Sequence, residues 1–253
     1  DFSRDESSYI DGSVIEYAAT GVSCNHSSPT IRESVFRNNA NGIAGDLESK
    51  IIIEDNTFIS NQYPVRVYGQ GIDNNISGNE YFNNVDENGN SSDYIYVLGN
   101  GDGERLRDNI TYDWLANGAP YRITNNLEVW EDGNQSEVAV LKIYPGAVVA
   151  FDGGKSLTIG QDNFDRTGAL QADGVTFTAV DSIQGWTQIY FHRETNDGLS
   201  YIDGSVIEYA ATGVSCNHSS PTIVNNILKK NGNGVSISSG SSPNVRSNQF
   251  ILN

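Results

Sequence analysis

Two identical segments of the chain contain the same side chains that could bind a ligand, in the same order. Residues 8–31 and residues 200–223 both read SYIDGSVIEYAATGVSCNHSSPTI, so the segment recurs after 192 positions. Each copy offers a tyrosine and a histidine that could contact a sugar: Tyr17 with His26, and Tyr209 with His218. Tyrosine suits this role because its ring is apolar and its hydroxyl forms hydrogen bonds. A carbohydrate-binding patch in each copy and an ordinary exposed surface are the two interpretations.

The segment VDENGNSSD, residues 85–93, gathers oxygen ligands in a turn that contains glycine. The candidate ligands are Asp86, Asn88, Asn90 and Asp93. Alternating carboxylate and amide oxygens in such a loop can hold Ca²⁺, although the glutamate that completes an EF-hand loop is missing. We therefore expect either a weak calcium site or a solvated turn here, and calcium is the one cofactor that the sequence suggests.

One further cluster mixes acidic and basic residues. The stretch GDGERLRDN contains Asp102, Glu104, Arg105, Arg107 and Asp108, and we expect it to form an exposed loop. Glycoside hydrolysis needs two carboxylates that face each other across a groove. We identify no such pair, no lyase base and no nucleophile paired with a histidine. The sequence thus leaves enzymatic activity open and favours a protein without it.

Asparagine triplets and the two cysteines bear on the compartment. The triplet Asn-X-Ser/Thr, which accepts N-linked glycans in exported proteins, begins at Asn25, Asn75, Asn90, Asn109, Asn134 and Asn217. A chain so rich in Asn and Ser contains many such triplets by chance. Cys24 and Cys216 are equivalent residues of the two copies. We expect each to be a small buried apolar residue, without a disulfide between them, since the copies would lie far apart.

Charge and hydrophobicity exclude two classes of partner. The chain has 15 Lys and Arg against 32 Asp and Glu, a formal net charge of -17. Nucleic-acid binding is not expected, because nothing would neutralise the phosphates. No stretch approaches the roughly 18 apolar residues of a membrane span. The chain begins at Asp1 and contains no methionine, which favours a processed product or a fragment.

A shorter period lies inside the 192-residue one. The segment VIEYAATGV (14–22) aligns with VFRNNANGI (35–43), and VFRNN (35–39) aligns with TFISN (57–61). A period of about 22 residues is typical of solenoids. Short alternating segments separated by Asn-Gly or Ser-Ser-Pro turns predict two or three strands in each repeat, and no long window has a helical period. The sequence therefore predicts an all-β fold, a right-handed parallel β-helix with about 22 residues per coil.

Asparagine recurs where these predicted strands end, at Asn39, Asn61, Asn84, Asn231 and Asn253. Asparagine tolerates left-handed backbone geometry at tight corners, and stacked asparagine side chains can form hydrogen bonds along the helix axis. We predict a structural role for these residues. Within GVSCN, the alternation of a strand predicts that Val22 and Cys24 face the core, whereas Ser23 and Asn25 face solvent.

Two segments carry a resemblance to a known group of proteins. The segment GAPYRITNNLEVWEDGNQSEVAVLKIYPGAVVAF (118–151) and the segment GWTQIYF (185–191) followed by IEYAATGVSCNHSSPTIVNN resemble secreted right-handed parallel β-helix repeat proteins. Many of these are bacterial or archaeal cell-surface proteins built from tandem modules. The resemblance implies that residues 1–113 are the C-terminal part of one module and that residues 114–253 are the N-terminal part of the next. It also implies an extracellular or cell-surface location.

These observations favour an extracellular structural or adhesive β-solenoid, as a segment of a repetitive cell-surface protein, sheath or fibre. Neither end resembles the polar cap that solenoids need, so we expect end-to-end self-association or further modules of the same chain. Two alternatives stay open. One is a polysaccharide-degrading enzyme, either a lyase or a glycoside hydrolase. The other is a non-catalytic carbohydrate-binding module; extracellular polysaccharide is the partner in both.

Overall fold

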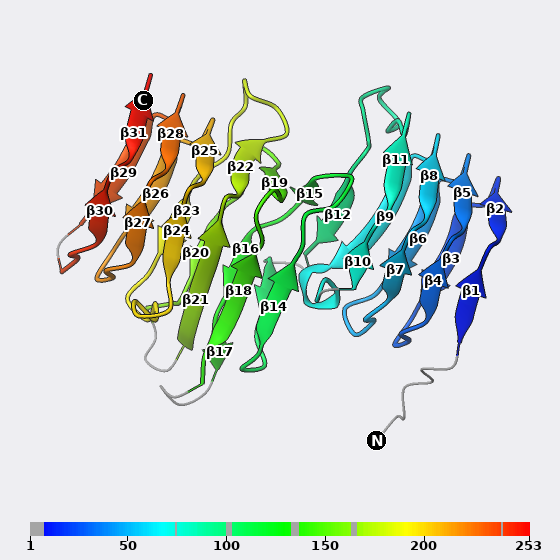
Figure 1. Cartoon of the computed structure of the whole chain (residues 1–253), viewed down its shortest axis with the longest axis horizontal. Helices are drawn as coiled ribbons and strands as arrows, with labels where there is room; N and C mark the ends of the chain where they lie inside the picture. The colour runs from blue at the N-terminus through cyan, green and yellow to red at the C-terminus, as the bar shows by residue number, and fades with distance from the viewer. Residues whose placement is uncertain (1–7, 74, 100–102, 133–136, 163–165, 239) are drawn as a thin grey trace. The chain divides into compact units, whose positions relative to one another are not determined.

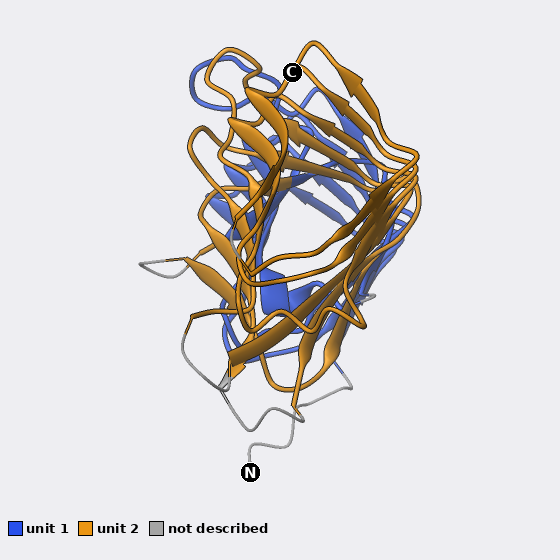
Figure 2. Cartoon of the chain, turned by 90° about the vertical axis from the view of Figure 1, so that its left-hand side faces the viewer, with its two compact units in different colours: residues 1–98, 115–121 blue, residues 99–114, 122–253 orange. Residues whose placement is uncertain are grey.

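The computed structural model describes residues 8–73, 75–99, 103–132, 137–162, 166–238 and 240–253. They contain strands β1 to β31 and one short 3-10 turn at Gly69–Gly71, so the described part of the chain is all-β (Figure 1). Two compact units are formed, coloured separately in Figure 2. Unit 1 comprises Asp1–Leu98 and Leu115–Tyr121, and unit 2 comprises Gly99–Trp114 and Arg122–Asn253. The two predicted modules are defined by the sequence repeat, and they stay a prediction.

Unit 1 winds through four successive coils of three strands each. They are β1 (Tyr9–Asp11), β2 (Val14–Glu16) and β3 (Thr20–Cys24); β4 (Thr30–Arg32), β5 (Val35–Arg37) and β6 (Asn41–Gly45); β7 (Ile52–Glu54), β8 (Thr57–Ile59) and β9 (Tyr63–Tyr68); and β10 (Ile76–Ser77), β11 (Glu80–Phe82) and β12 (Ile95–Leu98). Like strands pair in parallel, in the orders β1-β4-β7-β10, β2-β5-β8-β11 and β3-β6-β9-β12. This arrangement is the predicted parallel β-helix.

Unit 2 repeats the same plan over six coils. Its strands are β13 (Glu104–Leu106), β14 (Thr111–Trp114) and β15 (Tyr121–Ile123); β16 (Leu127–Val129), β18 (Ala139–Ile143) and β19 (Val148–Phe151); β20 (Leu157–Ile159), β21 (Arg166–Asp173) and β22 (Thr176–Ala179); β23 (Ile189–Phe191), β24 (Tyr201–Asp203) and β25 (Val206–Glu208); β26 (Thr212–Cys216), β27 (Thr222–Val224) and β28 (Ile227–Lys229); and β29 (Asn233–Ile237), β30 (Asn244–Arg246) and β31 (Gln249–Ile251). A short strand, β17 (Glu131–Asp132), pairs antiparallel with β21.

The strand registers stack like residues, because the coil length matches the sequence period. In unit 1, three corner backbone N–H groups donate to an asparagine Oδ1 that lies 21, 22 or 23 residues further along the chain. An aromatic column results, in which Phe36 stacks on Phe58 and Phe58 on Tyr81, with ring centroids 5.1 Å apart at each step. All three rings are buried. A prediction of about 22 residues per coil is therefore confirmed, although some coils of unit 2 are longer, with partners 30 residues apart.

The identical segments build identical strands in the two units. Residues 8–31 form β1 to β4, and residues 200–223 form β24 to β27. Cys24 and Cys216 are both buried and free, as predicted. Burial raises the pKa of the Cys24 thiol, and it raises that of Cys216 to about 12, so both thiols stay protonated at neutral pH.

Asparagine side chains join the coils at the corner between the second and third strands. The Nδ2 group of Asn39 donates to the carbonyl of Ile15 in the coil before, and to Oδ1 of Asn61 in the coil after, at 3.0 Å each. Asn61 makes the equivalent bonds to the Phe36 carbonyl and to Asn84 Oδ1. In unit 2 the equivalent corner lies between β28 and β29, where Asn231 bonds to Asn253 in the same way. Each ladder asparagine thus connects three coils, as its predicted structural role requires.

A second ladder follows the corner between the first and second strands, and the sequence analysis did not identify it. In unit 1 the backbone N–H of Ser34 donates to Asn56 Oδ1, and that of Asn56 donates to Asn79 Oδ1. In unit 2 the equivalent corner lies between β24 and β25, where Ser205 and Asn226 are joined likewise. These side chains are buried, so the ladders supply partners for corner amides that strand pairing leaves unpaired.

One part of the asparagine prediction was wrong. The ladder asparagines do not adopt left-handed geometry; the residue before each one does. Asn38, Ser60 and Asn83 have φ angles of 54°, 53° and 53°, and they precede Asn39, Asn61 and Asn84. The corner divides two tasks: the residue with positive φ turns the chain, and the next residue supplies the amide that bonds along the axis.

Replacing Phe58 tests the aromatic column. Phe58→Ala removes a fully buried ring between two stacked neighbours. We expect the free energy of unfolding to fall by about 3–5 kcal/mol, measured by chemical denaturation. The matched control is Phe82→Ala, since Phe82 is 47% exposed; its expected loss is below about 1 kcal/mol. Equal losses for the two variants would contradict the stacking account.

Replacing Asn61 tests the ladder. Asn61→Ala removes three hydrogen bonds. The buried N–H and Nδ2 groups of Asn39 lose the Oδ1 acceptor of Asn61, and the carbonyl of Phe36 loses its Nδ2 donor. Each buried unpaired group costs about 1–3 kcal/mol, so we expect a loss of about 3 kcal/mol or more in urea unfolding. Asn88→Ala is the control, because that side chain is exposed, and we expect a change below about 0.5 kcal/mol. A loss at Asn61 no larger than the control would show that the ladder is dispensable.

Candidate functional site

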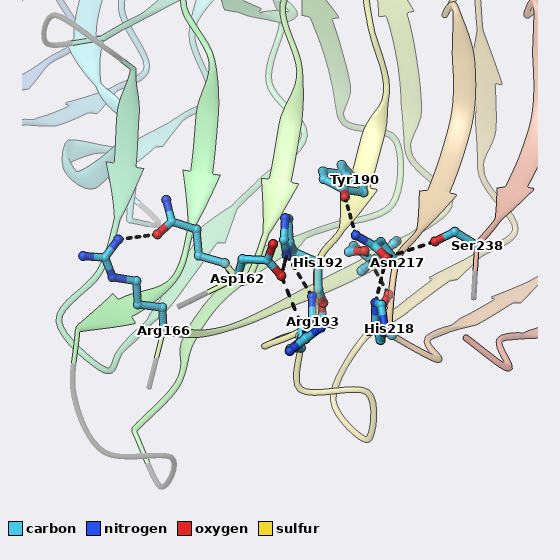
Figure 3. Close-up of polar contacts among 12 residues, drawn as sticks. Asp162, Arg166, Tyr190, His192, Arg193, Asn217, His218 and Ser238 are labelled. Atoms are coloured by element: carbon cyan, nitrogen blue, oxygen red, sulfur yellow. Dashed lines mark hydrogen bonds and ion pairs between the residues drawn. The ribbon is translucent and has the colours of Figure 1, made fainter. Parts of the chain in front are cut away.

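A row of polar side chains crosses four neighbouring coils of unit 2, at the carboxyl ends of β20, β23, β26 and β29 (Figure 3). We call it the polar strip, and it consists of Asp162, Tyr190, His192, Arg193, Asn217 and Ser238. Its position follows from strand alternation. Phe191 pairs in register with Cys216, and both side chains are buried in the core. The residues next to them in sequence therefore face outward, side by side on neighbouring strands.

Hydrogen bonds fix one half of the polar strip across three coils. The Ser238 hydroxyl lies 3.0 Å from Asn217 Oδ1 and 3.0 Å from the Cys216 carbonyl, and its one hydrogen is shared between these two acceptors. The Nδ2 group of Asn217 donates to the Tyr190 hydroxyl oxygen at 3.0 Å. Since that oxygen accepts a bond, the hydroxyl hydrogen of Tyr190 points elsewhere. Chains of this kind polarise each successive bond, which makes Tyr190 a strong and oriented donor.

In the other half of the polar strip, His192 contacts both Tyr190 and Asp162. Its side chain is only 15% exposed, and its ring meets the Tyr190 ring edge-on at 4.9 Å. The backbone N–H of Arg193 lies 3.0 Å from Nδ1 and donates to it in the tautomer that carries the proton on Nε2. Asp162 Oδ1 lies 3.3 Å from the same Nδ1 and accepts from it in the other tautomer; it also lies 3.8 Å from Nε of Arg193. The strip therefore combines the donor Tyr190 O–H, the Nε2 atom of His192 and one adjacent acidic acceptor.

A second cluster of unit 2 surrounds a buried indole. Trp130 is 1% exposed, and its Nε1–H donates to Glu128 at 3.0 Å. The guanidinium groups of Arg105 and Arg166 lie 3.9 Å and 4.4 Å from its ring centroid. Cation–π contacts of this kind hold both arginines in place. Sequence reasoning missed this cluster, because its members come from three different coils.

The predicted exposed loop around Arg105 is partly wrong. Glu104–Leu106 forms strand β13, and the Glu104 side chain is buried, because Leu106 and Glu104 alternate with the outward-facing Arg105. Arg107 and Asp108 are exposed, as predicted. Asp102 lies outside the described residues. The alternation in ERL indicated a strand, but the many charged residues around it favoured the interpretation as an exposed loop.

The four predicted sugar-binding residues all occupy left-handed corners. Their φ angles are 57° for Tyr17, 52° for His26, 60° for Tyr209 and 53° for His218. In each copy a five-residue strand, β3 or β26, separates the tyrosine from the histidine. Such a strand spans roughly 16 Å, so the structure does not bring the two side chains of a copy together. Binding of a sugar by these residues stays a prediction.

The two identical histidines have different neighbours in the next coil. Nδ1 of His26 lies 2.7 Å from Asp46 Oδ2, and its Nε2 lies 3.4 Å from Glu48. In the second copy the equivalent positions are Ser238 and Gly240, and the His218 ring packs over Gly240, where an added Cβ would come within 2.6 Å of it. Identical segments therefore present different surface chemistry, because the coil that follows each has diverged.

Asp46 is held in its charged form. Burial alone would raise its pKa, but the Ser49 hydroxyl, the His26 backbone N–H and the His26 ring outweigh burial, so the pKa of Asp46 lies below its ordinary 3.8. The Ser49 hydroxyl donates to Oδ1 at 2.6 Å. The carboxylate thus joins the first two coils of unit 1 at this corner.

The predicted calcium ligands divide between two structures. Asp86 Oδ1 accepts the backbone N–H groups of Asn88 and Asn90 at 2.9 Å each, inside one exposed turn. Asp93 instead accepts the N–H and Nδ2 groups of Asn84, at 3.0 Å and 2.7 Å, and so ends the asparagine ladder. Among the described residues, no group of three or more His, Cys, Asp or Glu is placed to hold a metal ion. Calcium binding stays a prediction.

The predicted glycosylation sites differ in exposure. Asn25, Asn90 and Asn109 are exposed, and Asn75 and Asn217 are half-buried. Asn134 lies outside the described residues. Modification of any of them stays a prediction.

Comparison with known proteins gives no relative on which to base a function. No protein-family model, no curated protein and no solved structure matches the chain. Within the described residues, no helix has the length and apolar character that crossing a membrane requires. The functional proposals therefore rest on the fold and on the geometry of the surface.

Substitution of Asp46 gives a pH-dependent prediction. A lowered folded pKa means that this carboxylate stabilises the fold above about pH 4, and that the contribution is lost as the pH falls through the folded pKa. We expect Asp46→Asn to reduce the free energy of unfolding at pH 7 by up to about 1 kcal/mol, since the group is partly exposed. At pH 2.5 the loss should shrink toward zero. Ser238→Asn, at the equivalent position, is the control without a carboxylate; a loss for Asp46→Asn that is independent of pH would contradict this account.

Proposed function

We propose that the chain is a structural segment of an extracellular, repetitive β-solenoid, used as a scaffold or adhesive element at a cell surface. One observation supports this most strongly: the same 24-residue segment builds the same four strands in both units, β1–β4 and β24–β27. Repetition of a whole coil, with its corners, is how solenoid proteins extend along one dimension.

The stabilising contacts favour a scaffold. Ladder hydrogen bonds and stacked rings both join each coil to its immediate neighbours, as the pairs Asn39–Asn61 and Phe36–Phe58 illustrate. Each added coil packs on the coil before it through the same contacts, so the number of coils is not limited by the size of one central core. The outward side chains are free to diverge meanwhile, as the different neighbours of His26 and His218 illustrate.

Charge and buried thiols are compatible with an extracellular location. A net charge of -17 keeps a repetitive protein soluble and limits unspecific association. Cys24 and Cys216 are buried within separate copies of the repeat, so neither depends on the redox state of its surroundings. The exposed triplet at Asn25 would accept a glycan in an export pathway.

Imaging of the native material tests the scaffold function. We expect negative-stain electron microscopy to show filaments or extended assemblies, or denaturing mass determination to show a chain much heavier than 27.5 kDa. Both measurements use the protein purified from its source without fragmentation. Discrete particles whose chains weigh about 27.5 kDa would contradict the proposal.

A further inference from the structure

The polar strip of unit 2 presents hydrogen-bond donors that the protein itself does not use. Tyr190 accepts a bond from Asn217, and its own hydroxyl hydrogen has no acceptor among the described residues. His192 uses Nδ1 toward the Arg193 N–H or toward Asp162, and its Nε2 has no partner in the described part of the chain. Tyr190 lies on β23, His192 directly follows that strand, and their rings are in contact. The Tyr190 O–H and the His192 Nε2 atom therefore lie next to each other on the outer face of the coil.

An acceptor and a compensating cation complete the strip. The Asp162 carboxylate, whose side chain is 65% exposed, lies beside His192 on the neighbouring coil. The Arg193 guanidinium is 3.8 Å from it, so the two formal charges offset each other locally. Figure 3 shows Asp162, His192 and Tyr190 following one another along the strip. The local surface is thus rich in hydrogen-bonding groups and close to neutral.

We propose that this strip binds an uncharged saccharide, in which one hydroxyl accepts from Tyr190 or bonds to His192 Nε2 and a neighbouring hydroxyl donates to Asp162. Sugar hydroxyls both donate and accept, so a pair of them satisfies a surface that contains a donor, an imidazole nitrogen and an acidic acceptor. Hydrogen bonds to the charged carboxylate are the stronger ones. The proposal adds a binding site to the scaffold function and does not depend on it.

Charge decides against an acidic ligand. A uronate or a sulfated sugar would approach the Asp162 carboxylate and a protein of net charge -17, which repels polyanions. Arg193 cannot attract such a ligand strongly, because Asp162 already lies beside it. An apolar ligand would leave the Tyr190 hydroxyl and the His192 Nε2 atom without partners, which costs free energy. An uncharged polyol avoids both penalties.

The architecture adds two features that favour a chain of sugars over a single one. Neighbouring coils are about 4.8 Å apart, which is close to the length of one sugar residue in an extended polysaccharide. On the same two coils as Asn217 and Tyr190, the outer face is extended by the Ser215 hydroxyl, which donates to Gln188 at 2.7 Å. Because the hydrogen bonds of Ser238 and Asn217 hold Tyr190 in place before a ligand arrives, little side-chain entropy is lost on binding.

The test is binding of the folded chain to oligosaccharides. An array of neutral glucans, mannans, xylans and galactans, with polygalacturonate as the charged comparison, identifies the best ligand, and calorimetry gives its affinity. We expect binding to at least one neutral oligosaccharide. Tyr190→Phe removes one donor and keeps the ring, and Asp162→Asn removes the carboxylate; each should weaken binding three- to tenfold. Tyr68→Phe, at a half-buried tyrosine of unit 1, is the matched control and should change the affinity less than twofold. Tyr209→Phe separately tests the duplicated segment as a competing site.

Each other result overturns the proposal. Retention of no neutral oligosaccharide by the wild-type chain excludes the site, and retention of polygalacturonate alone assigns the wrong ligand class. Loss of binding in Tyr209→Phe with none in Tyr190→Phe would transfer the site to the duplicated segment. Thermal unfolding of each variant verifies the fold. If Tyr190→Phe is unstable, Asp162→Asn still tests the site, because the Asp162 side chain is largely exposed and its replacement should not disturb the fold. None of these results depends on whether the native protein forms filaments.

Discussion

The hydrogen-bonded corner is the constraint on which the rest of this structure depends. A parallel coil of short strands leaves backbone N–H groups at its corners without strand partners, and buried unpaired groups are costly. Asn39, Asn61 and Asn84 solve this by accepting the corner N–H of the coil before and donating to a carbonyl of that coil. Since the amide of one coil must reach the amide of the next, the corners of neighbouring coils stay in register, even where a coil of unit 2 is longer. That register aligns buried columns such as Phe36, Phe58 and Tyr81.

The same constraint explains how the surface can diverge while the fold does not. Ladder side chains point inward and are fixed by hydrogen bonds to the coils on both sides. Outward-facing side chains need no such hydrogen bonds, so their residue types can change. The duplicated segment illustrates this, because His26 contacts Asp46 and Glu48 whereas His218 packs over Gly240. A scaffold whose interior is repetitive and whose exterior is variable can acquire binding surfaces such as the polar strip without loss of stability.

Periodicity allowed the fold to be predicted, and it allowed much less of the surface to be predicted. The 22-residue repeat identified the coils, and the recurring asparagines identified one ladder of two. The second ladder was missed because Ser34 and Asn56 are different residue types in one structural position. The polar strip was missed because Tyr190 and Asn217 are 27 residues apart, in coils of unequal length. Conversely, Tyr17 and His26 are near each other in sequence, yet β3 separates them in space.

Hydrogen exchange at the corner amides tests the central claim most directly. If the ladders hold the coils together, the backbone N–H groups of Asn39, Asn61 and Ala210 should exchange only through global unfolding, as slowly as the amides of the buried strands. Amides of exposed turns, such as Asn88, should exchange orders of magnitude faster. Exchange of the ladder amides at the rate of exposed turns would show that the corners open independently, and it would contradict the account.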